Sequence, residues 1–309
     1  MDESTKVSRE RRQREQDFLA ANPGQNSVTE INTNPLIPVF YSDLMTTSAG
    51  GISPSAAKPK YAISRWLAEG QPINIIAPRP ATCEQFYRAH NNDYVDGVFN
   101  GSRDNGFGNV EDDIAATLPY TTGSLIDATY EALRNGIGAV SPSSGFHHAG
   151  YYDGGGFCTF NGLMIAAREF PFGRIGIIDF DAHYGDGTDR IIRHLDLKNV
   201  IHFSQGRYTN PEPGVFLRGI EYTVSTMFGK CDVVLYQAGA DAHIEDPLGA
   251  GFLTTDELFE RDRIVFRTLR ALNIPVVWNL AGGYQRPFSK VLDIHNNTMT
   301  AFKESFYAK

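Results

Sequence analysis

Short apolar runs alternate along most of the chain with longer segments of helical periodicity. The runs are uninterrupted, rich in β-branched residues and too short for helices, which is typical of strands buried on both faces of a parallel sheet. They predict strands at 36–41, 73–78, 138–142, 175–180, 199–204, 232–237 and 275–280.

The segments between these runs carry helical patterns. We predict helices within 61–70, 121–136, 160–170 and 254–273. Thr254 or Thr255 can cap the start of the last of these before an acidic first turn. Asn135-Gly136 offers a C-terminal cap for the second. The alternation predicts an α/β fold with three αβα layers and a mostly parallel central sheet, formed as a single domain from 36 to 309.

The first 35 residues differ in composition from the rest. Charged residues dominate as far as Asp17, and a stretch rich in Asn, Pro, Gly and Ser follows. We interpret 1–35 as an N-terminal extension, with either a short helix around 9–21 or a solvated tail. An arm through which the chain forms an oligomer is a further alternative.

Composition excludes several classes of protein. The chain has 309 residues, of which 41% are hydrophobic, enough for a large buried core. Its formal net charge of −8 disfavours a partner that is a nucleic acid. Three scattered cysteines indicate a reducing compartment rather than a disulfide framework. We see no signal peptide and no membrane-spanning run, so we expect a cytoplasmic protein.

Chemically competent side chains follow four of the predicted strands. In open α/β sheets, ligands bind beyond the carboxyl ends of the strands, so these positions are the first to consider. The residues concerned are His147 and His148 after the third strand, Asp179, Asp181, His183 and Asp186 at the end of the fourth, Asp241 after the sixth, and Tyr284 after the seventh.

Asp181, His183 and Asp241 form a candidate metal site. Asp181 and His183 stand two apart on an extended segment and therefore point to the same side, and Asp241 can supply a third ligand from another strand end. Two carboxylates and one imidazole make an open site with room for water, as a catalytic zinc site requires. Either aspartate alone could instead cap the following helix.

The adjacent His147 and His148 are candidate proton carriers. A carboxylate on the far ring nitrogen fixes the tautomer of a histidine and raises its basicity. Asp179 and Asp186 remain after metal ligation, and we assign them this role. Tyr284 follows two glycines in AGGYQ, and a flexible backbone there would bring its hydroxyl to a polarised oxygen.

Five separate motifs resemble the histone deacetylase family in order and spacing. They are SGFHHAG, GGGFC, IIDFDAHYGDGT, YQAGAD with EDPLGAG, and AGGYQ, and the resemblance runs from about Val39 to the C-terminus. The DAH, EDPLGAG and GGYQ segments look most like the class IV branch. The chain departs from the family at Tyr184, where many members carry His or Gln.

The resemblance implies the arginase–deacetylase fold with one divalent metal, expected to be Zn²⁺, with Fe²⁺ or Co²⁺ as alternatives. It implies that Asp181, His183 and Asp241 are the metal ligands and that Tyr284 polarises the acyl carbonyl. By the same resemblance His147 and His148, backed by Asp179 and Asp186, carry the protons. The residues implied to bind substrate are Gly156 and Phe157, Tyr208 facing them, and Leu248 at the rim.

The expected reaction is zinc-dependent hydrolysis of an acyl-lysine side chain in a protein or peptide by metal-activated water, with an acetyl or longer acyl group. Three alternatives remain. An amidohydrolase acting on an acetylpolyamine or another small acylated amine would keep the chemistry. A ureohydrolase with two manganese ions is disfavoured because DAHYGD has one residue too many and His243 stands where that site needs a carboxylate. The last alternative is a non-catalytic acyl-lysine binder.

Overall fold

The computed structural model describes residues 35–49, 53–208, 210–249 and 251–307. The predicted extension at 1–35 lies, apart from Pro35, outside the described residues. The compact unit that begins at Leu36 contains all the elements given below.

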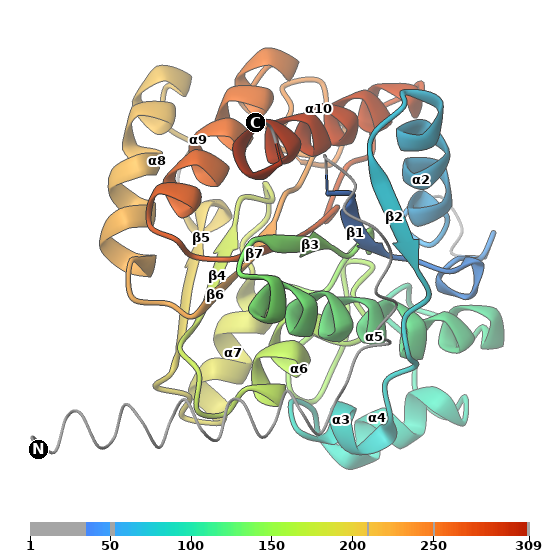
Figure 1. The fold of residues 1–309 in the computed structure, drawn as a ribbon. Coiled ribbons are helices and arrows are strands. Elements are labelled where there is room, and N and C mark those ends of the chain that lie inside the picture. Colours follow the sequence, from blue (N-terminus) through green and yellow to red (C-terminus); the bar gives the residue numbers. More distant parts are fainter. Residues whose placement is uncertain (1–34, 50–52, 209, 250, 308–309) are drawn as a thin grey trace, which may run out of the picture. The chain divides into compact units, whose positions relative to one another are not determined.

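A seven-stranded sheet forms the centre of this unit (Figure 1). Every pairing between its strands is parallel, and the strand order is β2-β1-β3-β7-β6-β4-β5. All seven predicted strands are confirmed, and each is one or two residues shorter than the predicted range. Their bounds are β1 (Ile37–Phe40), β2 (Ile73–Ile76), β3 (Gly138–Val140), β4 (Ile175–Asp179), β5 (Val200–Ser204), β6 (Val233–Gln237) and β7 (Val276–Asn279).

Helices cover both faces of the sheet, which confirms the three-layer αβα fold. On one face α2 packs against α10, α10 against α9, and α9 against α8; on the other, α5 packs against α6, and α6 against α7 (Figure 1). The helices are α2 (Lys58–Ala68), α3 (Cys83–Tyr87), α4 (Asn92–Phe99), α5 (Asp112–Asn135), α6 (Gly162–Glu169), α7 (Asp186–His194), α8 (Pro213–Phe228), α9 (Thr255–Ala271) and α10 (Ser289–Phe306); η1 (Asp43–Met45) and η2 (Gln205–Arg207) are single 3₁₀ turns.

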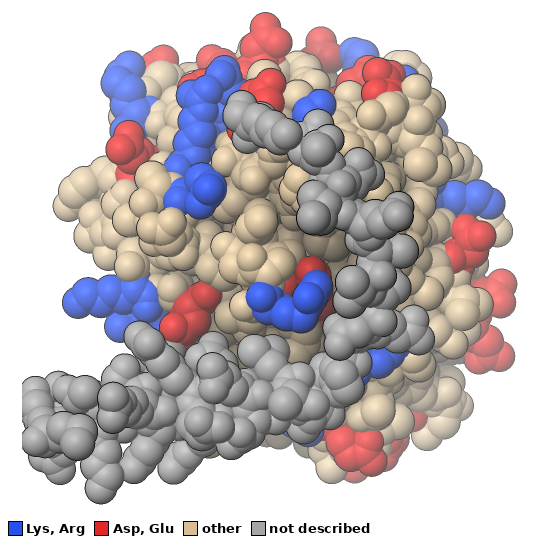
Figure 2. All heavy atoms as spheres, in the orientation of Figure 1, with Lys and Arg blue, Asp and Glu red and all other residues tan. Residues whose placement is uncertain are grey.

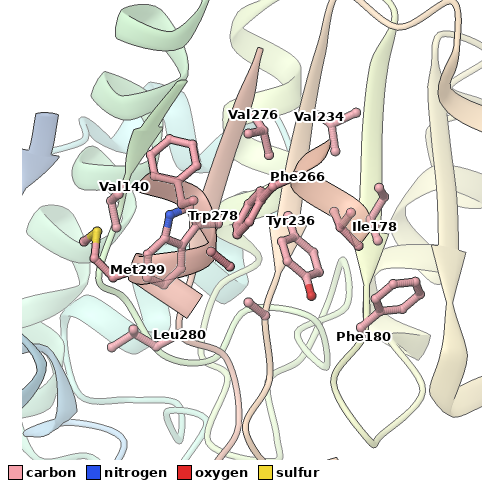
Figure 3. Packing of buried hydrophobic residues seen from close by; sticks show 14 of the residues in the cluster. Val140, Ile178, Phe180, Val234, Tyr236, Phe266, Val276, Trp278, Leu280 and Met299 are labelled. Atoms are coloured by element: carbon pink, nitrogen blue, oxygen red, sulfur yellow. The ribbon is translucent and has the colours of Figure 1, made fainter. Parts of the chain in front are cut away.

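The main core lies between the sheet and the face formed by α9 and α10. Alternate residues of the central strands, among them Tyr236 and Trp278, pack against Phe266 and Met299 from these helices (Figure 3). Both faces of β4, β6 and β7 are buried, as predicted from their continuous apolar runs. The prediction is wrong for the two edge strands: in β2 two residues are exposed and two partly buried, and in β5 three of five are only partly buried.

The sequence patterns missed several helices. Helix α5 begins at Asp112, not at 121, and continues through Pro119. The sequence patterns did not predict the short helices α3, α4 and α7 or the longer helices α8 and α10. The errors of prediction therefore concern helices outside the sheet and not the strands that position the site.

Charged side chains are interspersed by sign on the face shown in Figure 2, among the described residues visible there. In addition, none of the helices in the described part of the chain is both long and apolar enough to cross a membrane.

The predicted helix caps are confirmed. Gly136 ends α5 with a φ of 66°, a left-handed conformation that glycine adopts without steric cost. Thr254 caps α9: its hydroxyl accepts a hydrogen bond from the Glu257 amide, and the Glu257 carboxylate accepts one from the Thr254 amide. This reciprocal pair satisfies two backbone donors that the first turn would otherwise leave unpaired.

Replacing Thr254 with alanine should therefore destabilise the protein. We expect Thr254→Ala to lower the free energy of unfolding by about 1 kcal/mol, measured by urea denaturation. Thr226→Ala, an exposed substitution inside α8, is the control and should change it by less than about 0.5 kcal/mol. Equal effects in the two variants would mean that the capping box does not stabilise α9.

Candidate active site

The sheet brings the four chemically equipped strand ends together. Strands β3, β7, β6 and β4 are direct neighbours, although β5 separates β4 from β6 along the chain. Because all of them run parallel, their carboxyl ends lie at the same edge of the sheet. The side chains that follow them therefore converge on one place.

Asp181, His183 and Asp241 are close enough to share one ion. One ligand atom from each residue lies within 4.8 Å of the other two. His183 Nδ1 lies 2.9 Å from Asp241 Oδ2 and 3.2 Å from Asp181 Oδ1. Both carboxylates are buried, and backbone amides fix them: Gly282 donates to Asp181 at 2.8 Å, and Ala182 donates to Asp241 at 3.1 Å.

The electrostatics of this group fit a divalent cation. Burial and the neighbouring Asp181 carboxylate raise the pKa of Asp241 to about 7, because two negative charges repel each other strongly away from water. Hydrogen bonds to Asp181 and Asp241 raise the pKa of His183 to about 11. The carboxylates thus attract positive charge, and a bound cation would satisfy both of them at once.

The paired histidines each have a carboxylate partner, as predicted. His147 Nδ1 lies 2.8 Å from Asp179 Oδ2, and His148 Nδ1 lies 2.8 Å from Asp186 Oδ1. The two rings are adjacent, with centroids 4.1 Å apart. In both residues Nδ1 is thereby engaged. Nε2 of His147 lies 3.6 Å from Asp181 Oδ1, and Nε2 of His148 is the nitrogen available to a reactant.

Their environments push the two pKa values in opposite directions. Burial alone would lower the pKa of His147, but the Asp179 and Asp181 carboxylates outweigh it and raise that pKa to about 9. Burial and the charge of His147 lower the pKa of His148, and Asp186 only partly offsets them. Near neutral pH, therefore, His148 is the uncharged member of the pair.

A cavity of about 260 Å³ connects these groups. Its lining includes most of the predicted residues: His147, His148, Asp181, His183, Gly156, Phe157, Leu248 and Tyr284. The rings of Phe157 and Tyr284 lie 5.8 Å apart, and Gly156 lies so close to His148 that a Cβ there would come within 2.5 Å of the imidazole. Only glycine fits this wall without displacing the ring.

Of the predicted substrate-binding residues, Tyr208 does not line the cavity, and neither does His243 from the loop that follows β6. Tyr208 is 55% exposed and stacks on Phe203 with a centroid separation of 5.8 Å, so the structure does not bring it to the cavity with Phe157. His243 bonds Thr255, Glu245 and Gln285 through its ring nitrogens, and its imidazole serves the loop rather than the metal ligands.

Sequence reasoning missed four residues that line the cavity: Ser55, Gly145, Cys158 and Gly282. Cys158 and Gly282 lie inside the GGGFC and AGGYQ motifs, so the motifs themselves were the available signal. Ser55 carried none, because it precedes α2, some 90 residues from the nearest predicted site residue, and only the tertiary fold brings it there.

Backbone strain is concentrated at this site. Phe146, Phe157 and Ala281 have φ values of 105°, 64° and 53°, in the left-handed region that non-glycine residues avoid. Each stands beside a predicted functional residue: His147, Gly156 or the glycines before Tyr284. Such conformations persist only where surrounding contacts impose them, and they cluster at functional sites.

Known proteins resemble this chain over the same region. The histone deacetylase domain matches residues 55–216 and 209–299. An uncharacterized protein from the cyanobacterium Picosynechococcus is 30% identical over 59% of this chain and 67% of its own length. Histone deacetylase 2 of Arabidopsis thaliana is 30% identical over 50% of this chain and 46% of its own length. Polyamine deacetylase HDAC10 of Rattus norvegicus is 28% identical over 52% of this chain and 33% of its own length.

The crystal structure of the HDA15 HD domain has the same fold. It superposes with a TM-score of 0.70 at 17% identity and covers 88% of this chain and 90% of its own. The matching domain and the named deacetylases support a hydrolase of the deacetylase type. The chain belongs to the histone deacetylase family. The match spans less than half the length of the two deacetylases named above, and the class IV resemblance stays a prediction.

Asp241 should be needed for metal binding but not for folding. We expect Zn²⁺ to raise the melting temperature of the metal-free protein. At a free Zn²⁺ concentration 100 times the dissociation constant, the folded state should gain about 2.7 kcal/mol of stability. Asp241→Asn should abolish this rise while leaving the metal-free protein at least as stable, because it removes one of two repelling charges. Glu221→Gln, on the exposed surface of α8, is the control. An Asp241→Asn variant that Zn²⁺ stabilises normally would contradict the assigned ligand set.

Proposed function

We propose that this protein is a metal-dependent amidohydrolase that removes acetyl or longer acyl groups from the lysine side chains of proteins or peptides. One observation carries the proposal: two carboxylate-backed histidines and a tyrosine line a single cavity together with Asp181 and His183, which lie close enough to Asp241 to share a metal ion with it. Membership of the deacetylase family supports the same chemistry.

Asp181, His183 and Asp241 would hold the ion, for which we propose Zn²⁺, with Fe²⁺ or Co²⁺ as alternatives. When bound, such an ion polarises an acyl carbonyl and lowers the pKa of a bound water toward about 7. The ligand set leaves positions open for both, because the protein supplies only three side chains.

We assign proton transfer to His148. Its lowered pKa keeps the ring neutral near pH 7, so Nε2 can accept a proton from the attacking water and then deliver it to the leaving amine nitrogen. Asp186 holds Nδ1 and fixes the tautomer. His147 is hydrogen-bonded to Asp179, and its raised pKa of about 9 keeps the ring protonated near pH 7. Its positive charge lies beside the negative charge that develops on the substrate oxygen.

Tyr284 completes the site as a hydrogen-bond donor. Burial, with the charges of Asp181 and Asp241, raises the pKa of its phenol far above the ordinary value, so the hydroxyl stays protonated. A protonated phenol can donate to the oxyanion formed when water adds to the carbonyl. The Tyr284 amide donates to Asp246 at 2.7 Å, which fixes the backbone from which the ring projects.

The cavity suits a linear acylated amine. Phe157 and Gly156 form a wall along which an alkyl chain can pack, and Leu248 lies half-exposed beside it. We propose these as substrate-binding residues, and Tyr208 as a residue that faces a longer peptide outside the cavity. A cytoplasmic location belongs to the same proposal.

An acylated polyamine is the second candidate substrate. One relative of this chain is named a polyamine deacetylase. An acylated polyamine presents the same N-alkyl amide on a flexible alkyl chain, and the chemistry described for His148 and Tyr284 would act on it unchanged.

Hydrolysis assays with the zinc-loaded protein test this function. Acetyl-, octanoyl- and myristoyl-lysine peptides are compared with acetylputrescine and arginine. We expect turnover of the lysine peptides, and a 10²–10³-fold lower kcat in Tyr284→Phe because one oxyanion donor is lost. Tyr222→Phe, which is 75% exposed on α8, is the control. Activity confined to acetylputrescine would favour the polyamine reading, and full activity in Tyr284→Phe would refute the role given to the phenol.

The pH profile should report on the Asp186–His148 pair. Because the hydrogen bond that Asp186 accepts from His148 raises the pKa of His148, Asp186→Asn should lower that pKa and move the acidic limb of kcat/KM to lower pH. Asp153→Asn is a matched control, since Asp153 also contacts Arg190 but is not bonded to His148. An acidic limb that stays in place, or moves to higher pH, would argue against His148 as the proton acceptor.

A further inference from the structure

Lys58 is a buried cation that the chemistry described so far does not use. It is the first residue of α2, and its side chain is fully buried, among the largest such side chains in the described structure. A buried ammonium group is costly unless it is hydrogen-bonded or faces opposite charge. Its position therefore calls for a compensating interaction.

The Lys58 ammonium donates a hydrogen bond to the carbonyl oxygen of Ala281 at 2.6 Å. Ala281 is one of the left-handed residues, with φ at 53°, and it begins the segment that ends at Tyr284. A left-handed alanine needs contacts to impose its conformation. The Lys58 hydrogen bond is such a contact, because it fixes the carbonyl oxygen of that residue.

The rest of this segment is fixed from other sides. The Gly282 amide donates to the Asp181 carboxylate at 2.8 Å, and the Gly282 carbonyl accepts from the Ala240 amide at 3.0 Å. The Tyr284 amide is held by Asp246. The segment from Ala281 to Tyr284 is thus held by residues of the loops after β4 and β6, and by Lys58 of α2.

The charge of Lys58 also bears on the site. Burial lowers its pKa to about 8, against an opposing effect of the Asp241, Asp181 and Asp246 carboxylates. The ammonium lies 5.7 Å from the centroid of the Tyr284 ring, within the range of a cation–π interaction. One side chain therefore contacts the Tyr284 segment at both its first residue and its last.

We propose that Lys58 is a positioning residue for Tyr284. Its hydrogen bond to Ala281 and its contact with the ring set the direction of the phenol, and its positive charge reduces the repulsion between Asp181 and Asp241. This inference rests on the proposed role of Tyr284 as oxyanion donor. A lysine that served only the stability of the core would show no special coupling to that phenol.

A double-mutant comparison tests the proposal. Lys58→Met is introduced into the wild type and into Tyr284→Phe, with Lys60→Met, an exposed lysine of the same helix, as matched control. In the wild type we expect kcat on an acetyl-lysine peptide to fall about 10-fold or more, because a misdirected donor loses transition-state contact, while KM changes less than about twofold. In Tyr284→Phe the same substitution should change kcat less than about twofold.

Zinc affinity provides a readout independent of turnover. Measured by competition with a chelator, it should be unchanged or tighter in Lys58→Met, because a positive charge near the ligands has been removed. A merely structural role predicts weaker zinc binding together with equal loss of kcat in both backgrounds. Either of those results, or wild-type kcat in Lys58→Met, would overturn the proposal.

Lys58→Gln is a second variant in case Lys58→Met has a folding defect, which circular dichroism and the melting temperature would detect. It keeps a donor for Ala281 and loses the charge, so we expect a kcat between those of wild type and Lys58→Met. If Lys58→Met does not fold, the same comparison is made with Lys58→Gln; if neither folds, Lys58 serves the core and the proposal fails. Full activity in Tyr284→Phe alone would instead refute the role given to the phenol, and absence of turnover of every acylated substrate by the zinc-loaded wild type would refute the proposed function, whatever Lys58 does.

Discussion

Two carboxylates held face to face away from water are the constraint around which this site is built. Asp181 and Asp241 are both buried, and this burial, together with the charge of Asp181, raises the pKa of Asp241 to about 7. Nearly everything around them offers positive charge or a donor: the His183 ring, the backbone amides of Ala182 and Gly282, and the Lys58 ammonium. A structure that tolerates such a pair is organised to receive a cation.

The same constraint explains why glycines surround the carboxylates. A Cβ on Gly282 would lie 2.3 Å from an Asp241 oxygen, so the loop after β7 can approach the ligands only without a side chain. This approach lets one short segment both donate to a carboxylate and deliver a tyrosine to the cavity. Ligand geometry and the direction of Tyr284 are therefore set by a common piece of backbone.

Much of this arrangement could be predicted from the sequence. The strands were readable because their apolar runs are continuous, and the site was readable because His, Asp and Tyr residues follow four of them. Asp179 and Asp186 could be assigned to the histidines because metal ligation left them over, but which aspartate pairs with which histidine is seen only in the structure. Local pattern failed where distant segments meet: nothing near Lys58 or Ser55 signals contact with residues more than 200 positions away. The sequence also could not show that Tyr208 lies outside the cavity, with its ring on Phe203 of β5.

The strand order has a consequence for how the protein is made. Strand β7 is the last of the sheet to be synthesised, yet it lies in the middle, between β3 and β6. Before it is available, β2-β1-β3 and β6-β4-β5 are two separate half-sheets without a shared edge. The histidine pair belongs to one half and the carboxylates to the other, so a nascent chain cannot assemble the site until its final strand joins them. The strand order thus leaves the site incomplete in any chain that has not yet added β7.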